Sequence, residues 1–589
     1  MRYEITEQRK KYLDARGFTI LTACPGSGKT TSIVYKLKTL IKECRINNAN
    51  GSGILCLSFT NKACAEIISK YKEMHGTSIR YPNEIRTIDS FITQHIVFNY
   101  WYLIEGLSRP KIINEEELLR KLYFRYYKGN ECIQNKFYEY KKIIYQYHPE
   151  KVEYLGNNLF KIENKIISKD NDILFKYCAD VVRYRLTYGI LKSSDAILIA
   201  IKILKNYPIV AKSLANRFPY IILDEAQDAS EFQFYIIECL KNAGVKNIEL
   251  VGDVNQAIYE WRNAKPEIFQ RYTMKKEWNH LNLMENRRSV QRIIDFYSRL
   301  KPIGYPDIVS YGVVDNHIKI EIIRYNEGQE INALNRFKQI CDDYELNSRL
   351  ILVRGNEDLK KITKRKKGIK IWKNKIPYQI IEAKLLFDQN MIKEALDKMG
   401  WICANLICGE NNFESMKNYV QEKEGTIEFN IMLLKLLKSV PSLSLSFNIW
   451  DEKIKQLLKE TLKLTKNLDF AFKQKMSHQK IGNLRNESVG TYFGQVKENT
   501  VKVQTIHLAK GTSVDAVLLY LHAKSSVQGI SFYDIPDKSG GLNKVKEKHR
   551  LIYVACSRAR QLLAIAVPSS ITEEQIRQKL NGLDIHISS

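Results

Sequence analysis

Residues 23–30 read Ala-Cys-Pro-Gly-Ser-Gly-Lys-Thr, which fits the pattern GxxxxGK[ST] once alanine is allowed at the first position. An apolar run at 18–21 precedes them, and residues 31–40 follow with apolar side chains at helical spacing. A strand, a glycine turn and a helix in this order predict a phosphate-binding loop. Its backbone N–H groups and the helix N-terminus would surround the phosphates. Lys29 would reach the β- and γ-phosphates, and the Thr30 hydroxyl would hold Mg²⁺.

Two further segments end predicted strands in polar residues that suit phosphate chemistry. The apolar run 219–223 leads directly into Asp224 and Glu225, and the run 248–251 leads toward Gln256. Ligands bind at the carboxyl ends of parallel strands, so we expect these side chains to face the loop. Asp224 would hold Mg²⁺ through water, Glu225 would deprotonate the attacking water, and Gln256 would sense the γ-phosphate. Strands alternating with helices predict a parallel α/β sheet.

The charge balance indicates a polyanionic partner. The 589-residue chain has 92 Lys and Arg against 65 Asp and Glu, a net charge of +27, which favours nucleic acid. An AT-rich genome would also enrich lysine, and that alternative needs no nucleic acid. The 11 cysteines include no CxxC pair, which argues against zinc ribbons, iron–sulfur clusters and a disulfide framework. With no apolar leader and no long apolar run, we expect a cytoplasmic protein without membrane contact.

Taken in order, these segments resemble the motifs of a UvrD/Rep-type superfamily 1 DNA helicase. The resemblance extends from residue 5 to about residue 567 and is interrupted by two poorly matching insertions. Its later motifs are Glu285–Ser289, Ile351–Arg354, Thr505–Gly511 and Leu551–Ala559. The resemblance implies an α/β fold with two RecA-like P-loop NTPase domains, each with a parallel sheet and a mainly helical insertion. ATP, with Mg²⁺, would bind in the cleft between the two domains.

The resemblance also assigns roles to single positions. Gln8 would recognise adenine, Gln256 would sense the γ-phosphate, and Arg288 and Arg558 would be arginine fingers, which stabilise charge on the transferred phosphoryl group. The expected nucleotide contacts are Gln8, Ala23, Cys24, Pro25, Gly26, Ser27, Gly28, Lys29, Thr30, Thr31, Arg287 and Gly511. The expected contacts to the DNA strand are Phe59, Thr60, Asn61, Tyr259, Trp261, Arg262, Thr505 and His507.

Three positions depart from the family pattern. The family usually has a tyrosine that stacks on adenine where this chain has Arg287, although a guanidinium plane can also stack. It often has glutamate near the ribose where this chain has Ser513. Residues 510–517 drift toward the Pif1/RecD branch, which moves in the opposite direction along DNA. Residues 59–66, 224–228 and 286–289 favour the UvrD branch and hence 3′→5′ movement.

The expected domain order follows from the two insertions. The first RecA-like domain would comprise residues 1–98 and 189–280, interrupted by a helical insertion at 99–188. The second would comprise residues 281–385 and 491–589, interrupted by a helical insertion at 386–490. Aromatic residues within 99–188 could stack bases or simply form a core. The basic run Lys360–Lys367 could contact DNA or form a solvated face.

Three functions are compatible with this reading. The first is an ATP-driven translocase and helicase acting on single-stranded and tailed duplex DNA, in repair or anti-phage defence. The second is an ATP-gated DNA-binding or sensing subunit that works beside a separate nuclease and unwinds little. The third, a degenerate ATPase serving as a scaffold, conflicts with the intact set Lys29, Glu225, Gln256, Arg288 and Arg558. DNA or RNA preference is left open, as is a 5′→3′ direction.

Overall fold

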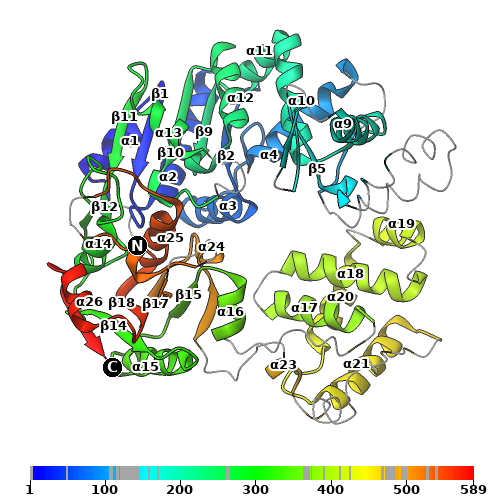
Figure 1. Ribbon diagram of the computed structural model, residues 1–589. Coiled ribbons are helices and arrows are strands. Elements are labelled where there is room, and N and C mark those ends of the chain that lie inside the picture. Colours follow the sequence, from blue (N-terminus) through cyan, green and yellow to red (C-terminus); the bar gives the residue numbers. More distant parts are fainter. Residues whose placement is uncertain are drawn as a thin grey trace. The chain divides into compact units, whose positions relative to one another are not determined.

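The structure is a computed structural model whose chain divides into two units, residues 1–354 with 506–589 and residues 355–505 (Figure 1). The structure describes residues 4–47, 51–104, 110–114, 119, 140, 143, 146–156, 159–163, 165–168, 172–259, 265–362, 372, 374–388, 392–409, 413–423, 426–465, 468, 470, 486, 488–492, 501–524, 529–537 and 541–588.

The first unit contains two parallel sheets. One is a 6-stranded sheet with the order β11-β1-β10-β9-β2-β3. Its strands are β1 (Phe18–Ala23), β2 (Ile54–Ser58), β3 (Glu84–Thr87), β9 (Tyr220–Asp224), β10 (Asn247–Gly252) and β11 (Asn279–Leu283). All five residues of β2 and of β9 are buried, as expected for strands covered on both faces. The carboxyl ends of β1 and β9 therefore meet at one edge, because every strand pair in this sheet is parallel.

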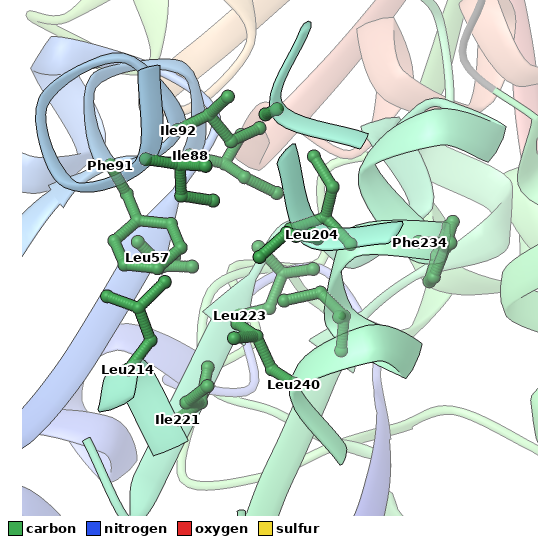
Figure 2. Packing of buried hydrophobic residues seen from close by; sticks show 14 of the residues in the cluster. Leu57, Ile88, Phe91, Ile92, Leu204, Leu214, Ile221, Leu223, Phe234 and Leu240 are labelled. Carbon is green, nitrogen blue, oxygen red and sulfur yellow. The ribbon is translucent and has the colours of Figure 1, made fainter. Parts of the chain in front are cut away.

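Helices of the first unit cover this sheet. They include α1 (Glu7–Asp14), α2 (Lys29–Asn47), α3 (Asn61–His75), α4 (Ile88–Phe91), α10 (Ser193–Asn206), α11 (Pro208–Arg217), α12 (Glu231–Asn242) and α13 (Pro266–Tyr272). Figure 2 shows one side of the core, where Leu57 and Leu223 from the strands pack among Phe91, Leu204 and Leu240 from the helices. A separate buried cluster, which includes Ile33 and Val34 of α2, packs against the opposite face.

The second sheet of this unit carries the later motifs. Within the unit its strands follow the order β15-β17-β18-β14-β19, and they pair in parallel. They are β14 (Ile320–Tyr325), β15 (Arg349–Val353), β17 (Val514–Tyr520), β18 (Ala559–Pro568) and β19 (Ile585–Ser588). The helices beside them are α14 (Gln291–Ser298), α15 (Glu330–Asp343), α24 (Ile506–Ala509), α25 (Glu547–Cys556) and α26 (Glu573–Lys579). The predicted α/β class with two RecA-like sheets is confirmed.

The described part of the first insertion contains strands that the sequence did not predict. Beside α9 (Asp172–Thr187) it holds an antiparallel sheet of β5 (Val152–Gly156), β6 (Leu159–Ile162) and β7 (Lys165–Ile167). Alternation supports these strands, since Phe160 and Ile162 are buried while Leu159 is exposed. Gly156 and Glu163, which end β5 and follow β6, have positive φ angles of 85° and 54°. Such turns are typical of β-hairpins. The aromatic, lysine-rich composition of the segment had instead favoured helices.

The second unit is built mainly of helices around its own core. They are α16 (Asn356–Ile362), α17 (Ile376–Asp388), α18 (Ile392–Cys408), α19 (Phe413–Lys423), α20 (Ile427–Ser439), α21 (Phe447–Leu462) and α23 (Val489–Tyr492), followed by strand β16 (Lys502–Thr505). Its core surrounds Trp372 and Trp450. The expected boundary at residue 386 falls inside α17, because the apolar spacing of that helix begins ten residues earlier at Ile376. Among the described residues, no helix is long and apolar enough to cross a membrane.

Candidate active site

The loop between β1 and α2 has the geometry of a phosphate cradle. Gly26 and Gly28 take positive φ angles of 74° and 83°, a conformation that side chains disfavour. A Cβ atom on Gly26 would lie 2.6 Å from the Arg288 Cβ, so the glycine also permits close approach of the segment after β11. Lys29 is the first residue of α2. The backbone N–H groups at this helix start are therefore available to an anion.

A cavity of about 530 Å³ opens over this loop. Its walls come from both sheets of the first unit, with the loop residues Cys24–Thr31 on one side. Other predicted site residues that line it are Phe59, Thr60, Asp224, Glu225, Gln256, Tyr259, Arg287, Arg288, His507, Gly511 and Arg558. Gln8, Ala23 and Asn61, also predicted, are not part of its lining. Ala23 ends β1 and is fully buried, and Asn61 begins α3.

Opposite charges meet at the floor of the cavity. The Lys29 Nζ lies 2.8 Å from Glu225 Oε1, and Asp224 precedes that glutamate at the end of β9. Burial works against both charges, yet Glu225 and Asp224 raise the pKa of Lys29, and Lys29 and Lys510 lower the pKa of Glu225. Glu225 is therefore ionised, as a base must be. Its backbone has a positive φ of 55°, a strained conformation for glutamate that turns the chain sharply at the strand end.

The residues around Asp224 fit a divalent cation. Burial raises the pKa of Asp224 to about 7, and among the described residues its Oδ1 atom is buried without a hydrogen-bond partner. Carboxylate and hydroxyl oxygens are ligands that Mg²⁺ prefers, and Thr30 lines the same cavity. An unsatisfied buried carboxylate oxygen costs free energy that a cation would offset. Asp224 and Thr30 would hold it.

Two arginines, Arg288 shortly before α14 and Arg558 directly before β18, reach the same cavity. Arg558, between α25 and β18, donates from Nη2 to Gln256 Oε1 at 3.1 Å, and Gln256 donates in turn to Asp253 at 2.9 Å. Arg288 donates to the Ser557 carbonyl at 2.8 Å. Burial and the neighbouring Arg288 lower the pKa of Arg558 to about 9. Two mutually repelling guanidinium groups in one buried site create a strong demand for an anion, which a triphosphate supplies.

The residues expected near the base and the ribose each have a protein partner or a defined backbone conformation. Gln8 Oε1 accepts from the Met284 N–H at 2.8 Å. Arg287 lines the cavity, and its Nη1 donates to Glu4 at 2.7 Å. Gly511 has a positive φ of 82°, and Ser513 accepts from Arg560 Nε at 3.0 Å. The Ser513 hydroxyl is therefore bonded to Arg560, at the position where the family often has a glutamate near the ribose.

Lys510 is a site residue that the sequence analysis did not single out. Its ammonium pairs with Asp228, lies 3.5 Å from Glu225 Oε2 and donates to the Gln256 carbonyl at 3.0 Å. A signal was present, because Lys510 directly precedes the predicted nucleotide contact Gly511. Only the structure brings it to the acidic residues, more than 280 positions away in the chain.

The aromatic residues predicted for the DNA strand gather beside the cavity. The rings of Phe59 and Tyr259 stack with centroids 5.6 Å apart, and the His507 ring lies 6.0 Å from Tyr259. The Thr60 hydroxyl caps α3 by accepting from the Ala63 N–H at 3.1 Å. Thr505 ends β16 in the second unit. Trp261, Arg262 and residues 363–367 of the basic run lie outside the described residues.

This geometry defines a class of protein. The site combines a glycine loop before a helix, an acidic strand end and an arginine directly before a strand of the second parallel sheet. This combination is typical of an NTPase whose site is completed by two lobes.

The comparisons with known proteins give the family. The UvrD/REP helicase N-terminal domain matches residues 5–277, and the UvrD-like helicase C-terminal domain matches residues 410–570. The chain therefore belongs to the UvrD/Rep-type superfamily 1 helicases, ATP hydrolases coupled to DNA unwinding.

Several curated helicases are similar along most of their length. The ATP-dependent DNA helicase Rep of Buchnera aphidicola subsp. Schizaphis graminum is 25% identical, over 93% of this chain and 90% of the relative. A probable DNA helicase II homolog of Mycoplasma capricolum is 22% identical, over 92% of this chain and 81% of the relative. The ATP-dependent DNA helicase PcrA of Staphylococcus epidermidis is 21% identical, over 95% of this chain and 82% of the relative.

Proposed function

We propose that this chain is a motor that hydrolyses ATP between its two RecA-like lobes, moves 3′→5′ along single-stranded DNA and separates duplex DNA. The observation that carries the proposal is the Arg558–Gln256 hydrogen bond of 3.1 Å, which joins the second sheet to the γ-phosphate side of the first. Hydrolysis of ATP beside this hydrogen bond would change a contact between the two lobes, in addition to the conformation of the phosphate-binding loop. Repair or anti-phage defence is the proposed setting.

The proposed lobes follow the parallel sheets. The first comprises residues 1–98 and 189–280, and the second comprises residues 281–354 and 506–589 in the first unit. We assign ATP to the cavity of about 530 Å³ that both lobes line. Single-stranded DNA would lie along the stacked rings of Phe59 and Tyr259, since base stacking on aromatic rings tolerates any sequence.

In the proposed mechanism the loop and Lys29 hold the phosphates. To do so the Lys29 ammonium leaves Glu225, its partner at 2.8 Å, and turns to the phosphate oxygens. Glu225 then accepts a proton from the attacking water. Arg288 and Arg558 stabilise the charge that develops on the γ-phosphoryl oxygens. Mg²⁺, when bound by Asp224 and Thr30, would neutralise charge on the β- and γ-phosphates.

Loss of the γ-phosphate would release the arginines of the second lobe. Gln256 senses that change, because one end of its amide bonds to Arg558 and the other to Asp253. Tyr259 lies three residues after Gln256, so a shift there reaches the aromatic stack. Alternating closure and release would move the lobes along the strand.

The test measures ATP hydrolysis with and without single-stranded DNA, together with unwinding of 3′-tailed and 5′-tailed duplexes. We expect strand-stimulated hydrolysis and unwinding of the 3′-tailed substrate. Glu225→Gln should lower hydrolysis about 10²–10⁴-fold while ATP still binds. Glu231→Gln is the matched control, because Glu231 pairs with Lys265 on the exposed surface.

Each of the following results would contradict one part of the proposal. Unwinding of the 5′-tailed substrate alone would overturn the direction. Stimulation without unwinding of either substrate would indicate an ATP-gated DNA-binding subunit that relies on a separate nuclease. Unchanged hydrolysis in Glu225→Gln would remove the assigned base.

A further inference from the structure

The carboxylate of Asp253 receives hydrogen bonds from both lobes. Asp253 directly follows β10 and is fully buried. From the first lobe, the Asn255 N–H donates to Oδ1 at 3.0 Å and Gln256 Nε2 donates to Oδ2 at 2.9 Å. From the second lobe, the Tyr305 hydroxyl donates to Oδ1 at 3.0 Å and the Tyr553 hydroxyl donates to Oδ2 at 3.4 Å. Four converging donors suit the ionised form of the carboxyl group, which only accepts hydrogen bonds.

The direction of the hydrogen bond between Tyr305 and Asp253 is fixed by their ionisation. Burial raises the pKa of Asp253, and the hydrogen bonds from Gln256 and Tyr305 work against that rise. Burial and the charge of Asp253 raise the pKa of Tyr305 well above its usual range. The tyrosine hydroxyl therefore keeps its proton and serves Asp253 as a donor.

The carboxylate of Asp253 determines the orientation of the Gln256 amide. An ionised carboxylate only accepts hydrogen bonds, and a guanidinium only donates them. The amide therefore turns its NH₂ group to Asp253 and its Oε1 atom to Arg558, whose Nη2 donates to it at 3.1 Å. The opposite orientation would place an oxygen against the carboxylate and two donors against each other. Tyr305 holds the other oxygen of Asp253 and so limits rotation of the carboxylate.

The second lobe carries Tyr305 in a segment that is fixed by backbone pairing. This segment follows α14 and pairs with Leu542, shortly before α25. The Leu542 N–H donates to the Lys301 carbonyl at 2.8 Å, and the Ile303 N–H donates to the Leu542 carbonyl at 3.2 Å. The Tyr305 N–H donates to the Pro302 carbonyl at 3.1 Å, and its ring packs against the core of the second sheet. The Tyr305 hydroxyl would therefore move together with the second lobe.

The hydrogen bond from Tyr305 to Asp253 depends on closure of the two lobes. Its donor belongs to the second lobe and its acceptor to the first, 52 positions earlier in the chain. A hydrogen bond of this length is lost once its two atoms separate by roughly a further 0.5 Å. Opening of the lobes would release the carboxylate of Asp253, and the Gln256 amide would then be free to turn.

We infer that Tyr305 is a positioning residue for ATP hydrolysis, because its hydroxyl holds Asp253 and thereby fixes the Gln256 amide only while the lobes are closed. Tyr305 lies outside the motifs that carry the family resemblance, between Glu285–Ser289 and Ile351–Arg354. The inference rests on the proposed function, since it takes Gln256 to face the γ-phosphate of ATP. It deepens that function by naming a hydroxyl that makes hydrolysis depend on lobe closure.

The experiment measures steady-state ATP hydrolysis by the full-length chain with saturating single-stranded DNA. Tyr305→Phe removes the hydroxyl and keeps the ring. We expect kcat to fall about tenfold, the effect of losing one hydrogen bond to a charged group, while the KM for ATP stays within about twofold. Tyr553→Phe should lower kcat less, because its hydrogen bond to Asp253 is longer, at 3.4 Å. Tyr344→Phe is the matched control and should leave kcat unchanged, because Tyr344 is 51% exposed.

A double-variant cycle separates positioning from a general loss of packing. Gln256→Ala removes the amide through which Tyr305 acts, and its slow hydrolysis is followed at high enzyme concentration. In that background Tyr305→Phe should change kcat by less than about twofold, because no amide is left to orient. A further tenfold loss in the Gln256→Ala background would mean that Tyr305 supports the structure as a whole, which would overturn the inference.

Failure of the inference can be distinguished from failure of the proposed function. An unchanged kcat in Tyr305→Phe, with strand-stimulated hydrolysis intact in the unaltered chain, would overturn the inference alone. A raised KM at unchanged kcat would make Tyr305 a residue for nucleotide binding and would also overturn it. A larger loss in Tyr553→Phe than in Tyr305→Phe would transfer the role to Tyr553. Absence of ATP hydrolysis by the unaltered chain would reject the proposed function itself.

Discussion

Lys510 is a cation that lies close to two acidic residues of the cavity and to the aromatic stack. Its Nζ atom pairs with Asp228, lies 3.5 Å from Glu225 Oε2 and lies 5.0 Å from the centre of the Tyr259 ring. A base stacked near Tyr259 would change the surroundings of this ammonium and therefore its pull on Glu225. We regard Lys510 as a positioning residue that links strand occupancy to hydrolysis.

Replacing Lys510 by alanine should uncouple binding of single-stranded DNA from ATP hydrolysis. We expect DNA-stimulated ATP hydrolysis to fall about 10–100-fold, the effect of losing a hydrogen bond to a charged group, while ATP binding changes little. Steady-state hydrolysis at rising concentrations of single-stranded DNA measures the effect. Lys319→Ala, which removes an exposed lysine, is the control. If Lys510→Ala lowers basal and stimulated rates by the same factor, Lys510 serves hydrolysis alone.

Asp228 gives the nucleotide-free protein a pH dependence. Burial raises the pKa of Asp228 to about 6, even though Lys510 opposes the shift. In the unfolded chain this carboxyl ionises near pH ~3.9, so between about pH 4 and pH 6 the folded protein binds more protons than the unfolded one. This contribution to stability is therefore full below about pH 4 and is lost as the pH rises to about 6.

Asp228→Asn should remove that contribution. We expect the unfolding free energy of the unaltered protein to decline relative to the variant by about 2–3 kcal/mol between pH 4 and pH 6. Urea unfolding at several pH values measures the difference in slope, which is independent of any constant cost of the substitution. Parallel profiles for the two proteins would mean that Asp228 has an ordinary pKa.

At the residue scale, the sequence predicts the positions of side chains that directly follow a strand or begin a helix. Lys29, Asp224 and Glu225 come together as expected, because they end parallel strands or begin the helix after one. Arg287 bonds to Glu4 and lies over the ring of Tyr311, and these contacts were not predictable because they depend on the pairing of two short strands, Glu285–Asn286 and Val309–Ser310. Arg287 was expected as a nucleotide contact and as a departure from the family pattern, but nothing local to it points to Tyr311.

At the element scale, a buried ion pair holds the first sheet to the helices beneath the phosphate loop. Lys36 of α2 pairs with Glu249 of β10, and neither side chain is more than 1% exposed. Glu249 also accepts from Tyr12 of α1 at 2.9 Å and from Tyr220 of β9. Four elements thus share one carboxylate, and its removal leaves a buried ammonium uncompensated.

Glu249→Gln should destabilise the first sheet by about 3–5 kcal/mol, as expected when a buried pair loses one partner. The double variant Glu249→Gln with Lys36→Met should be more stable than Glu249→Gln alone, because no ammonium stays unpaired. Urea unfolding measures both. Glu7→Gln breaks an exposed pair with Lys11 and should cost less than about 0.5 kcal/mol. A double variant less stable than the single one would contradict this account.

Elements with strong local signals were predicted better than those without. The apolar run 219–223 matches strand β9 to within one residue at each end, and every residue of this strand is buried. Strands β5, β6 and β7 were overlooked, since each has five residues or fewer and lies among aromatic and basic residues typical of an amphipathic helix. Short strands take their stability from pairing, which a local pattern does not contain.

At the scale of the whole molecule, the two units keep separate cores. The core of the second unit draws on residues 372–489, whereas the cores beneath both parallel sheets draw on the first unit. Every residue that lines the nucleotide cavity also belongs to the first unit. The sequence located this second insertion from a break in the family motifs, but its extent depends on tertiary contacts that no motif records.

The second unit should therefore be dispensable for folding of the first and for binding of ATP. Strand β15, which ends at Val353, contacts α24, which begins at Ile506, so a Gly-Ser linker of several residues can join Arg354 to Ile506. We expect the shortened chain to unfold cooperatively and to bind ATP within about threefold of the full chain, since the same residues hold it. Calorimetry and thermal unfolding with and without ATP measure this.

The reciprocal fragment makes the test two-sided. Residues 355–505 alone should give the circular dichroism of a helical protein, because Trp372 and Trp450 pack within their own cluster. A soluble first unit that no longer binds ATP would show that the second unit shapes the cavity. A first unit that does not fold would show that the two cores depend on each other, although they share no residue.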